Sequence, residues 1–243
     1  MKFAVISDIH GNMFALDAVL EDIKLHNVDK IFCLGDLAMA GPEPNKTIDY
    51  IKNQDWTIIQ GNTDYMIVNF SEDLFQKVAS NAPIMANALK YDVKEITAEN
   101  VEYLKNLPAQ KSIELDGVKI LLVHGSPRKN DENIFPDLSM KKIEEIVENV
   151  AESVIFCGHT HIPCGYQTNS KKTIVNVGSV GRPFTENPQA CYVLAEAVNG
   201  QLLVEHHMVN YDKVSASKML AKQDFDGATK LAQMLINPET RHM

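Results

Sequence analysis

Three short apolar runs at the start of the chain constrain its fold more than any other feature. They cover residues 2–7, 30–34 and 56–60, and the stretches between them predict helices. In the first stretch apolar residues recur with helical spacing from Leu16, and Pro44 opens the second. Strands that alternate with helices form parallel sheets with right-handed crossovers. The N-terminal part of the chain is therefore predicted to be an α/β unit.

The remainder of the chain continues this mixture of helices and strands. Residues 64–110 are predicted to form a helical insertion, with helical segments at 65–90 and 97–106. The tail at 215–235 is expected to be helical. We interpret 1–243 as a single domain with two sheets and outer helices. The strands predicted after the insertion cover residues 112–115, 118–123, 154–157, 173–177, 191–195 and 202–209.

Charge and composition exclude several classes of protein. Acidic residues outnumber basic ones by 32 to 23, which gives a net charge of −9 and disfavours duplex nucleic acid as a partner. No apolar run approaches the roughly 20 residues that span a bilayer, so no membrane is expected. The N-terminus lacks the pattern of a secretory signal, which predicts a cytoplasmic protein. Free thiols are expected for Cys33, Cys157, Cys164 and Cys191.

Metal-ligand side chains follow the predicted strands at five places. The carboxyl ends of strands in open α/β sheets gather ligand sites, so these side chains are expected to meet in one pocket. Carboxylate, amide and imidazole donors together suit transition metals better than Mg²⁺ or Ca²⁺. Seven donors exceed the needs of one ion and indicate two, bridged by one carboxylate. The seven candidates are Asp8, His10, Asp36, Asn62, His124, His159 and His161.

The order of the motifs is more specific than any one of them. They run Asp8-x-His10, Gly35-Asp36, Gly61-Asn62-x-Asp64, His124 and Gly158-His159-x-His161. This order resembles the signature of the calcineurin-like metallophosphoesterase superfamily. Residues 176–183 resemble the segment that follows the last motif in its compact prokaryotic phosphodiesterase branch.

The resemblance implies a fold and a metal centre. The fold would be a four-layer α/β/β/α sandwich with two mixed β-sheets flanked by helices. Two divalent ions are implied, with Mn²⁺ preferred and Fe²⁺, Ni²⁺ or Zn²⁺ as alternatives, and a bridging hydroxide would attack phosphorus. One ion would be held by Asp8, His10 and His161, the other by Asn62, His124 and His159, with Asp36 as the bridge. The catalytic residues implied are Asp36, Asn62, Asp64 and His124.

The resemblance has one informative exception, at Thr63. Many relatives carry at this place a His that the following acid orients and that assists the leaving group. Asp64 is present here but the imidazole is not. The sequence does not identify a residue that replaces this general acid. The exception favours substrates with good leaving groups over alkyl monoesters.

The predicted activity is that of a phosphodiesterase for small nucleotide-like or activated diesters, such as dinucleoside polyphosphates. The alternatives are a phosphomonoesterase or protein phosphatase, and a protein-binding scaffold of the same fold. The expected partner is a small phosphate ester, and a homo-oligomer is compatible with the sequence. Candidate substrate contacts are Asn12, which could instead cap a helix, and Ser126 and Arg128 in the loop after His124. His26 and the pair His206-His207 are assigned structural roles.

Overall fold

Strand β1 (Lys2–Ile6) shows how the apolar runs become a sheet that is covered on both sides. Its Phe3 and Val5 belong to a core between two sheets, whereas Ala4 and Ile6 belong to a core between one sheet and its helices. Successive side chains of a strand point to opposite faces, so a continuous apolar run is what a strand inside a layered fold requires.

Residues 1–238 are described by the computed structural model, and within them the chain forms two mixed five-stranded sheets. The first sheet has the order β10-β9-β1-β2-β3. In it β1 and β2 are parallel, as are β2 and β3, whereas β9 is antiparallel to both β1 and β10. Its strands besides β1 are β2 (Lys30–Cys33), β3 (Thr57–Ile58), β9 (Ala190–Val198) and β10 (Gln201–Val209).

The second sheet has the order β4-β5-β6-β8-β7. The hairpin β4–β5 is antiparallel, β5, β6 and β8 are parallel, and β7 is an antiparallel edge strand. The four-residue strand β7 was not predicted, because its sequence, Cys-Gly-Tyr-Gln, contains a glycine and no β-branched residue. The strands are β4 (Gln110–Leu115), β5 (Val118–Val123), β6 (Val154–Cys157), β7 (Cys164–Gln167) and β8 (Thr173–Asn176).

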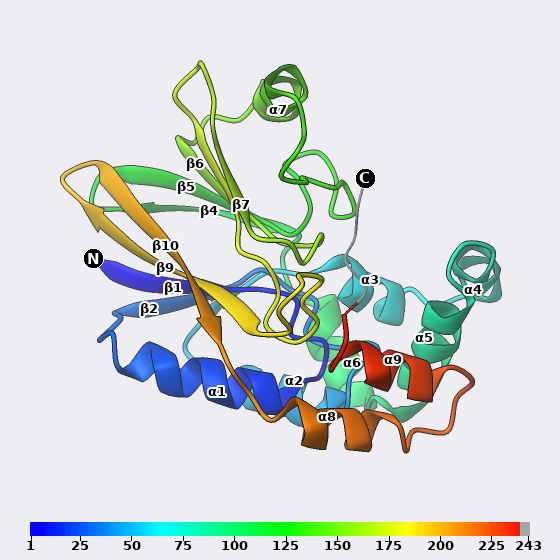
Figure 1. Ribbon diagram of the computed structural model, residues 1–243. Helices are drawn as coiled ribbons and strands as arrows, with labels where there is room; N and C mark the ends of the chain where they lie inside the picture. The colour runs from blue at the N-terminus through cyan, green and yellow to red at the C-terminus, as the bar shows by residue number, and fades with distance from the viewer. Residues whose placement is uncertain (239–243) are drawn as a thin grey trace.

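Helices cover the outer face of each sheet (Figure 1). Helix α1 (Met13–Lys24) lies below the first sheet and α7 (Met140–Val147) lies above the second. A third apolar cluster, between α7 and the second sheet, includes Ile143 and Ile155. The layers are therefore helix, sheet, sheet and helix, which confirms the predicted sandwich of two mixed sheets. The remaining helices are α2 (Pro44–Ile51), α3 (Asn62–Val68), α4 (Glu72–Ala79), α5 (Pro83–Glu95), α6 (Ala98–Lys105), α8 (Lys213–Leu220) and α9 (Ala228–Met234).

Two helical segments are more divided than the sequence predicted. The segment 65–90 contains parts of three helices, because the side chain of Ser71 caps α4 and Pro83 opens α5. The tail at 215–235, which was expected to be helical, contains two helices, α8 and α9. Gly227 precedes α9 with a φ of 102°, a left-handed conformation that a continuous helix does not contain.

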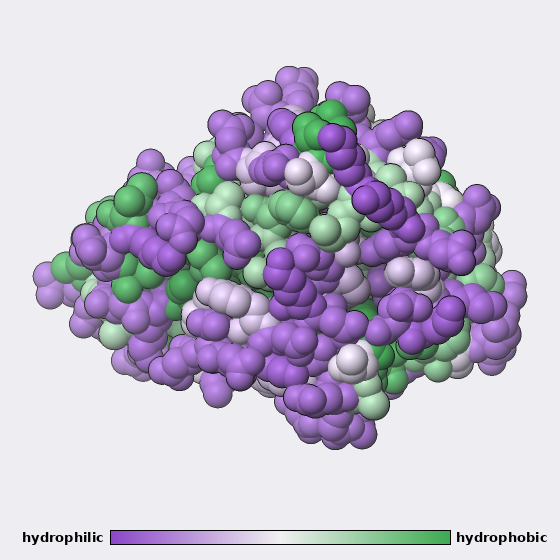
Figure 2. Space-filling model, turned by 90° about the horizontal axis from the view of Figure 1, so that it is seen from below, coloured by the Kyte–Doolittle hydropathy of each residue, from purple (hydrophilic) through white to green (hydrophobic). Residues whose placement is uncertain are grey.

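The face seen from below is mainly hydrophilic, with apolar residues in patches between the polar ones (Figure 2). Among residues 1–238, no helix has the length and apolar character that crossing a bilayer requires. All four cysteines are free thiols, as predicted, and three of them are buried.

Candidate metal centre

The predicted ligands occupy loops at the carboxyl ends of strands from both sheets. Asp8 and His10 follow β1, Asp36 follows β2, and Asn62 opens α3 after β3. The second sheet contributes three imidazoles. His124 follows β5, and the loop after β6 carries the other two, His159 and His161.

Asp8, His10, Asp36 and His161 form the first group, and all four are buried. Nε2 of His161 lies 3.1 Å from Oδ1 of Asp8 and 3.2 Å from Nε2 of His10. Oδ2 of Asp36 lies 3.6 Å from Nε2 of His10. Oδ1 of Asp8 is buried and has no hydrogen-bond partner among the described residues. Four donor atoms from three loops therefore face one small volume.

Asn62, His124 and His159 form the second group, beside the first. Oδ1 of Asn62 lies 2.9 Å from Nε2 of His124 and 2.8 Å from Nδ1 of His159. Oδ2 of Asp36, the same oxygen that faces His10, lies 3.4 Å from Nε2 of His124. Asp36 therefore lies between the two groups of donors.

Backbone carbonyls fix the orientation of three imidazoles. Nδ1 of His10, His124 and His161 each lies 2.6–2.9 Å from a carbonyl oxygen. Because a carbonyl only accepts, each Nδ1 carries a proton and each Nε2 faces the cluster. Metal-binding histidines in proteins are held in this way. The carbonyls belong to Met39, Leu34 and Arg182, respectively.

The buried charges shift one another's pKa values. Burial opposes ionisation of Asp8 and Asp36, but the neighbouring imidazoles outweigh it, and they lower the pKa of Asp36 to about 2 and hold that of Asp8 below its ordinary value. Burial would lower the pKa of His124, yet the adjacent carboxylates raise it to about 10. Burial lowers the pKa of His10 to about 3 and that of His159 to about 4. The carboxylates are therefore ionised, and His10 and His159 are uncharged at neutral pH, which suits a cation.

Five of the seven predicted ligands have a left-handed backbone conformation. Their φ angles are 55° for Asp8, 50° for His10, 54° for Asp36, 66° for His159 and 62° for His161. This region costs a residue other than glycine about 1–2 kcal/mol. Strained residues that cluster in this way are typical of functional sites, where the surrounding structure holds them in place.

Asp64 is buried and uses its carboxylate on the backbone of the neighbouring loops. Oδ2 accepts from the backbone N–H groups of Asp36 at 2.8 Å and Gly61 at 3.0 Å, and Oδ1 accepts from that of Leu37 at 2.9 Å. The carboxylate therefore fixes the loop that carries Asp36. A Cβ atom at Gly61 would lie 2.1 Å from Oδ1 of Asp36, so this close approach requires glycine.

Thr63 is also buried, with 4% of its surface exposed. Its backbone N–H donates to Oδ1 of Asp36 at 2.8 Å, and its hydroxyl donates to the carbonyl of Ala38 at 3.0 Å. Position 63 therefore orients the second oxygen of Asp36, and its side chain is held against the protein.

Residues 176–183 form hydrogen bonds to the loops that carry the predicted ligands. The amide of Asn176 donates to the carbonyl of Gly158 at 2.8 Å. The hydroxyl of Ser179 and the N–H of Gly181 both donate to the carbonyl of Asp8, at 2.8 Å and 2.9 Å. The segment 176–183 thus holds the backbone of the loops that carry the predicted metal ligands.

The three candidate substrate contacts have partners within the protein. Asn12 caps α1 and donates through Nδ2 to the carbonyl of Gly181 at 2.9 Å. Ser126 donates to a carboxylate oxygen of Glu132 at 2.5 Å, and Arg128 forms an ion pair with the same carboxylate. Asn12 is therefore a structural cap, as the alternative interpretation expected, and Ser126 and Arg128 share an acidic partner.

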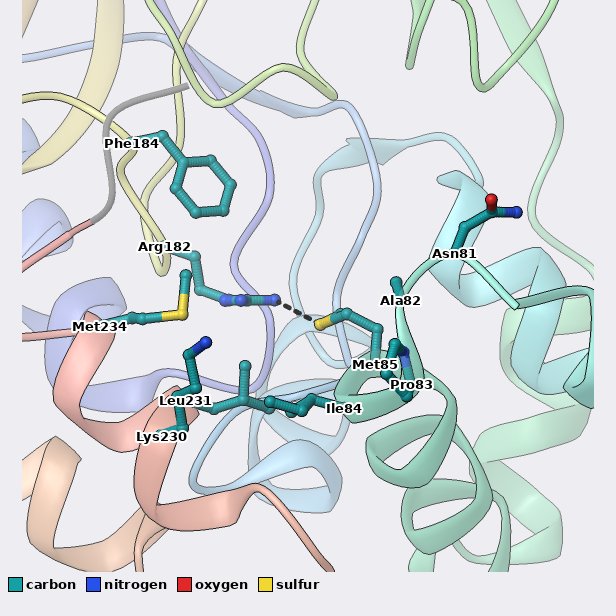
Figure 3. A pocket seen from close by; sticks show the side chains of 10 residues that line it. All are labelled: Asn81, Ala82, Pro83, Ile84, Met85, Arg182, Phe184, Lys230, Leu231 and Met234. Atoms are coloured by element: carbon teal, nitrogen blue, oxygen red, sulfur yellow. Dashed lines mark hydrogen bonds between the residues drawn. The ribbon is translucent and has the colours of Figure 1, made fainter. Parts of the chain in front are cut away.

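Arg182 and Phe184 line a cavity of about 440 Å³ (Figure 3). The ring of Phe184 stacks on that of His161 with 4.7 Å between centroids, and Arg182 donates to Sδ of Met85 at 3.5 Å. No pattern in the sequence marks Phe184 beyond its place two residues after Arg182. The cavity combines two cationic side chains with an apolar wall. Its lining residues are Asn81, Ala82, Pro83, Ile84, Met85, Arg182, Phe184, Lys230, Leu231 and Met234.

The sandwich with a paired Asp/His cluster between its sheets is the architecture of a metallophosphoesterase. Residues 1–200 match the calcineurin-like phosphoesterase superfamily domain, and the chain belongs to this family. An uncharacterized protein of Methanocaldococcus jannaschii is 33% identical over 236 residues, which cover 90% of this chain and 91% of that protein.

Two solved structures resemble nearly the whole chain. A metallophosphoesterase from Sphaerobacter thermophilus is 26% identical, with a TM-score of 0.77, and the match covers 98% of this chain and 99% of the other. A hypothetical protein from Pyrococcus horikoshii OT3 is 24% identical with a TM-score of 0.87, and 99% of each chain is covered. The second likeness shows the fold alone.

The donors fit the divalent metals that this superfamily binds. Nε2 of His10 and Nε2 of His161 lie 3.2 Å apart, beside a buried carboxylate oxygen of Asp8 that has no hydrogen-bond partner among the described residues. Burying such a carboxylate oxygen without a partner is costly, and a divalent cation would bind all three atoms. Mixed nitrogen and oxygen donors favour a transition metal.

Proposed function

We propose that the protein is a dinuclear metal-dependent phosphodiesterase. The observation that carries this proposal is the position of Asp36, whose Oδ2 lies within 3.6 Å of His10 in one donor group and within 3.4 Å of His124 in the other. A single carboxylate oxygen between two sets of donors is the arrangement that a bridged pair of ions needs.

The proposal assigns each ligand to one of two ions. Asp8, His10 and His161 would hold the first ion, and Asn62, His124 and His159 the second, with Asp36 between them. When bound, divalent ions supply activation of water and neutralise the charge of a phosphate group in its transition state. We propose Mn²⁺ as the preferred ion, with Fe²⁺, Ni²⁺ or Zn²⁺ as alternatives.

Residue 63 helps to position Asp36 and does not donate a proton. The carboxylate of Asp64 fixes the backbone of Asp36, and the N–H of Thr63 fixes the side chain of Asp36. Thr63 has no acidic proton to donate at neutral pH. Asp64 thus acts as a positioning residue, and the leaving group must depart without help from this position.

This absence of assistance favours leaving groups of low basicity. Aryl diesters and phosphoanhydrides have such leaving groups, and alkyl monoesters do not. The cavity that Phe184 lines has an apolar and aromatic wall, which suits the flat base of a nucleotide. We therefore propose a small nucleotide-like diester or a dinucleoside polyphosphate as substrate. Ser126 and Arg128 would contact it only by exchanging Glu132 for the substrate.

The test is a substrate panel with Mn²⁺-loaded protein. Bis(p-nitrophenyl) phosphate and diadenosine tetraphosphate should be hydrolysed with higher kcat/KM than p-nitrophenyl phosphate and an alkyl monoester. Higher kcat/KM for the alkyl monoester would show a phosphomonoesterase instead. No turnover of any substrate by protein that holds two metal equivalents would favour a binding scaffold.

A further inference from the structure

A second group of metal-ligand side chains lies at the far end of α1. Asp22 is in the last turn of α1, His26 is in the turn that follows, and His207 is on β10. Asp22 is ten residues beyond Asn12, the cap beside the catalytic loops, so the helix alone separates the two places by about 15 Å. The sequence assigned His26 and His207 structural roles.

The three side chains converge although they come from two elements. Oδ2 of Asp22 lies 3.7 Å from Nε2 of His26 and 3.6 Å from Nδ1 of His207. The two imidazole rings lie 4.7 Å apart at an angle of 80°. Residues four apart lie on the same side of a helical turn, which brings Asp22 and His26 together opposite the strand. Three donor atoms therefore surround one point.

Neighbouring residues hold this group in place. The hydroxyl of Tyr192, on β9, donates to Oδ2 of Asp22 at 2.7 Å, and its ring lies 5.1 Å from that of His207. Tyr192 is fully buried and pairs with His207 across the sheet. The side chains of Asp22, His26 and His207 are 29%, 28% and 18% exposed. The group is thus supported from inside and reachable from solvent.

The other ring nitrogen of His207 also has the surroundings of a metal-binding histidine. Its Nε2 is buried and has no hydrogen-bond partner among the described residues, and the nearest carboxylate oxygen, Oε2 of Glu205, lies 3.6 Å away. When Nδ1 of a histidine binds a cation, Nε2 carries the proton. Ligating histidines commonly direct this N–H at a carboxylate. Glu205 is placed to receive it.

We infer that Asp22, His26 and His207 form a mononuclear Zn²⁺ site, separate from the phosphoesterase cluster. Two imidazoles and one carboxylate are the donor types that Zn²⁺ accepts in a four-coordinate site, with water in the fourth position. Mg²⁺ and Ca²⁺ prefer oxygen donors alone. The bound ion would join the end of α1 to β10, the edge strand of the first sheet.

The experiment counts Zn²⁺ equivalents by equilibrium dialysis of the metal-free full-length protein. D22N, H26N and H207N should each bind one equivalent fewer than the wild type. Asp17→Asn removes the same charge from an exposed position of the same helix and should lose none. Circular dichroism and the midpoint of thermal unfolding in EDTA show whether each variant is folded. The three substitutions lie at the end of α1 and on β10, so local unfolding of one element does not explain a loss of Zn²⁺ that all three variants share.

The result does not depend on the proposed catalytic function. The deficit of one equivalent in H207N should persist when Asp36→Asn has disabled the first cluster, and Mn²⁺-dependent hydrolysis by H207N should equal that of the wild type. Equal numbers of equivalents in the wild type and all three variants would overturn the inference. So would an equal loss in D17N, which would show unspecific binding to the acidic surface.

Discussion

Asp64→Asn gives the sharpest test of how the protein positions Asp36. The carboxylate accepts three backbone hydrogen bonds, two at Oδ2 and one at Oδ1. An asparagine has one oxygen, and if it keeps the two bonds at the Oδ2 position, its NH₂ group faces the N–H of Leu37. One bond to a charged group is lost and a buried donor is left unsatisfied.

The expected cost follows from these contacts. A hydrogen bond to a charged group contributes about 1.5–3 kcal/mol, and an unsatisfied buried donor costs about 1–3 kcal/mol. Relief of the repulsion between Asp64 and Asp36 offsets part of this. We expect D64N to lower the free energy of unfolding by about 3 kcal/mol and to lower kcat/KM by about 10–100-fold, as the loss of supporting contacts at metal sites does.

Urea denaturation in EDTA measures the stability, and Mn²⁺ titration measures the metal affinity. If D64N lies within about 0.5 kcal/mol of the wild type and binds Mn²⁺ equally well, the three bonds do not support the site and the reasoning is wrong. A loss of kcat with unchanged stability would instead indicate that Asp64 acts on the substrate.

Asp92 provides a matched control. It is equally buried, and it accepts one backbone hydrogen bond, from the N–H of Ala40 at 2.8 Å, while its Oδ1 has no partner among the described residues. Burial raises the pKa of Asp92 to about 7. Between pH 4 and pH 7 the folded state therefore binds the proton that the unfolded state has lost, so wild-type stability falls as the pH rises. D92N keeps the bond to Ala40. Its free energy of unfolding relative to that of the wild type should rise by about 2–3 kcal/mol between pH 5 and pH 7. Burial and the charge of Asp36 raise the pKa of Asp64 to about 7 as well, so D64N should show a similar pH dependence, from a stability that the lost bond to Leu37 has lowered.

Three further predictions follow from the same cluster. Asp36→Asn should lose both ions or nearly all turnover, and elemental analysis that finds two tightly held ions with a normal rate would refute the bridge. Thr63→His should lower stability and leave the dependence of kcat/KM on leaving-group pKa unchanged, because Thr63 is buried and Asp64 is engaged with backbone; a selective gain for poor leaving groups would contradict this. His159 has a φ of 66°, so H159G should be more stable than H159A by about 1 kcal/mol in EDTA. At position 124 the order should reverse, with H124A more stable than H124G. Urea denaturation measures both differences.

The sequence predicted the layers well because each depends on local patterns. The alternation of Phe3 and Val5 with Ala4 and Ile6 is visible in any apolar run between two turns. The ligand positions were predictable for a similar reason, since strand ends in parallel sheets meet at one edge. The break before Gly227 does have a local signal, since Asp226-Gly227 is a typical turn dipeptide, but the apolar residues on either side of it obscured this signal.

Contacts between distant segments were beyond the sequence. Asp64 was expected to orient a catalytic group, and nothing in its neighbourhood along the chain shows that it would accept the N–H groups of Asp36 and Leu37, 28 and 27 residues away. The meeting of Asp22 with His207 depends in the same way on the register of β9 and β10. Such contacts require three-dimensional knowledge because many registers satisfy the same hydrophobic pattern.

The left-handed backbone conformation of five predicted ligands indicates that the site is retained to bind a cation and is not a by-product of the fold. Five residues other than glycine at positive φ cost roughly 1–2 kcal/mol each, which together equals much of the stability of an ordinary domain. Glycine at those positions would relieve the strain, and apolar residues in the pocket would remove the buried charges. A scaffold that served only to present its outer surface would gain from both changes. The chain instead retains carboxylates and imidazoles in these conformations, and the cation that they are arranged to bind is the component that recovers the cost.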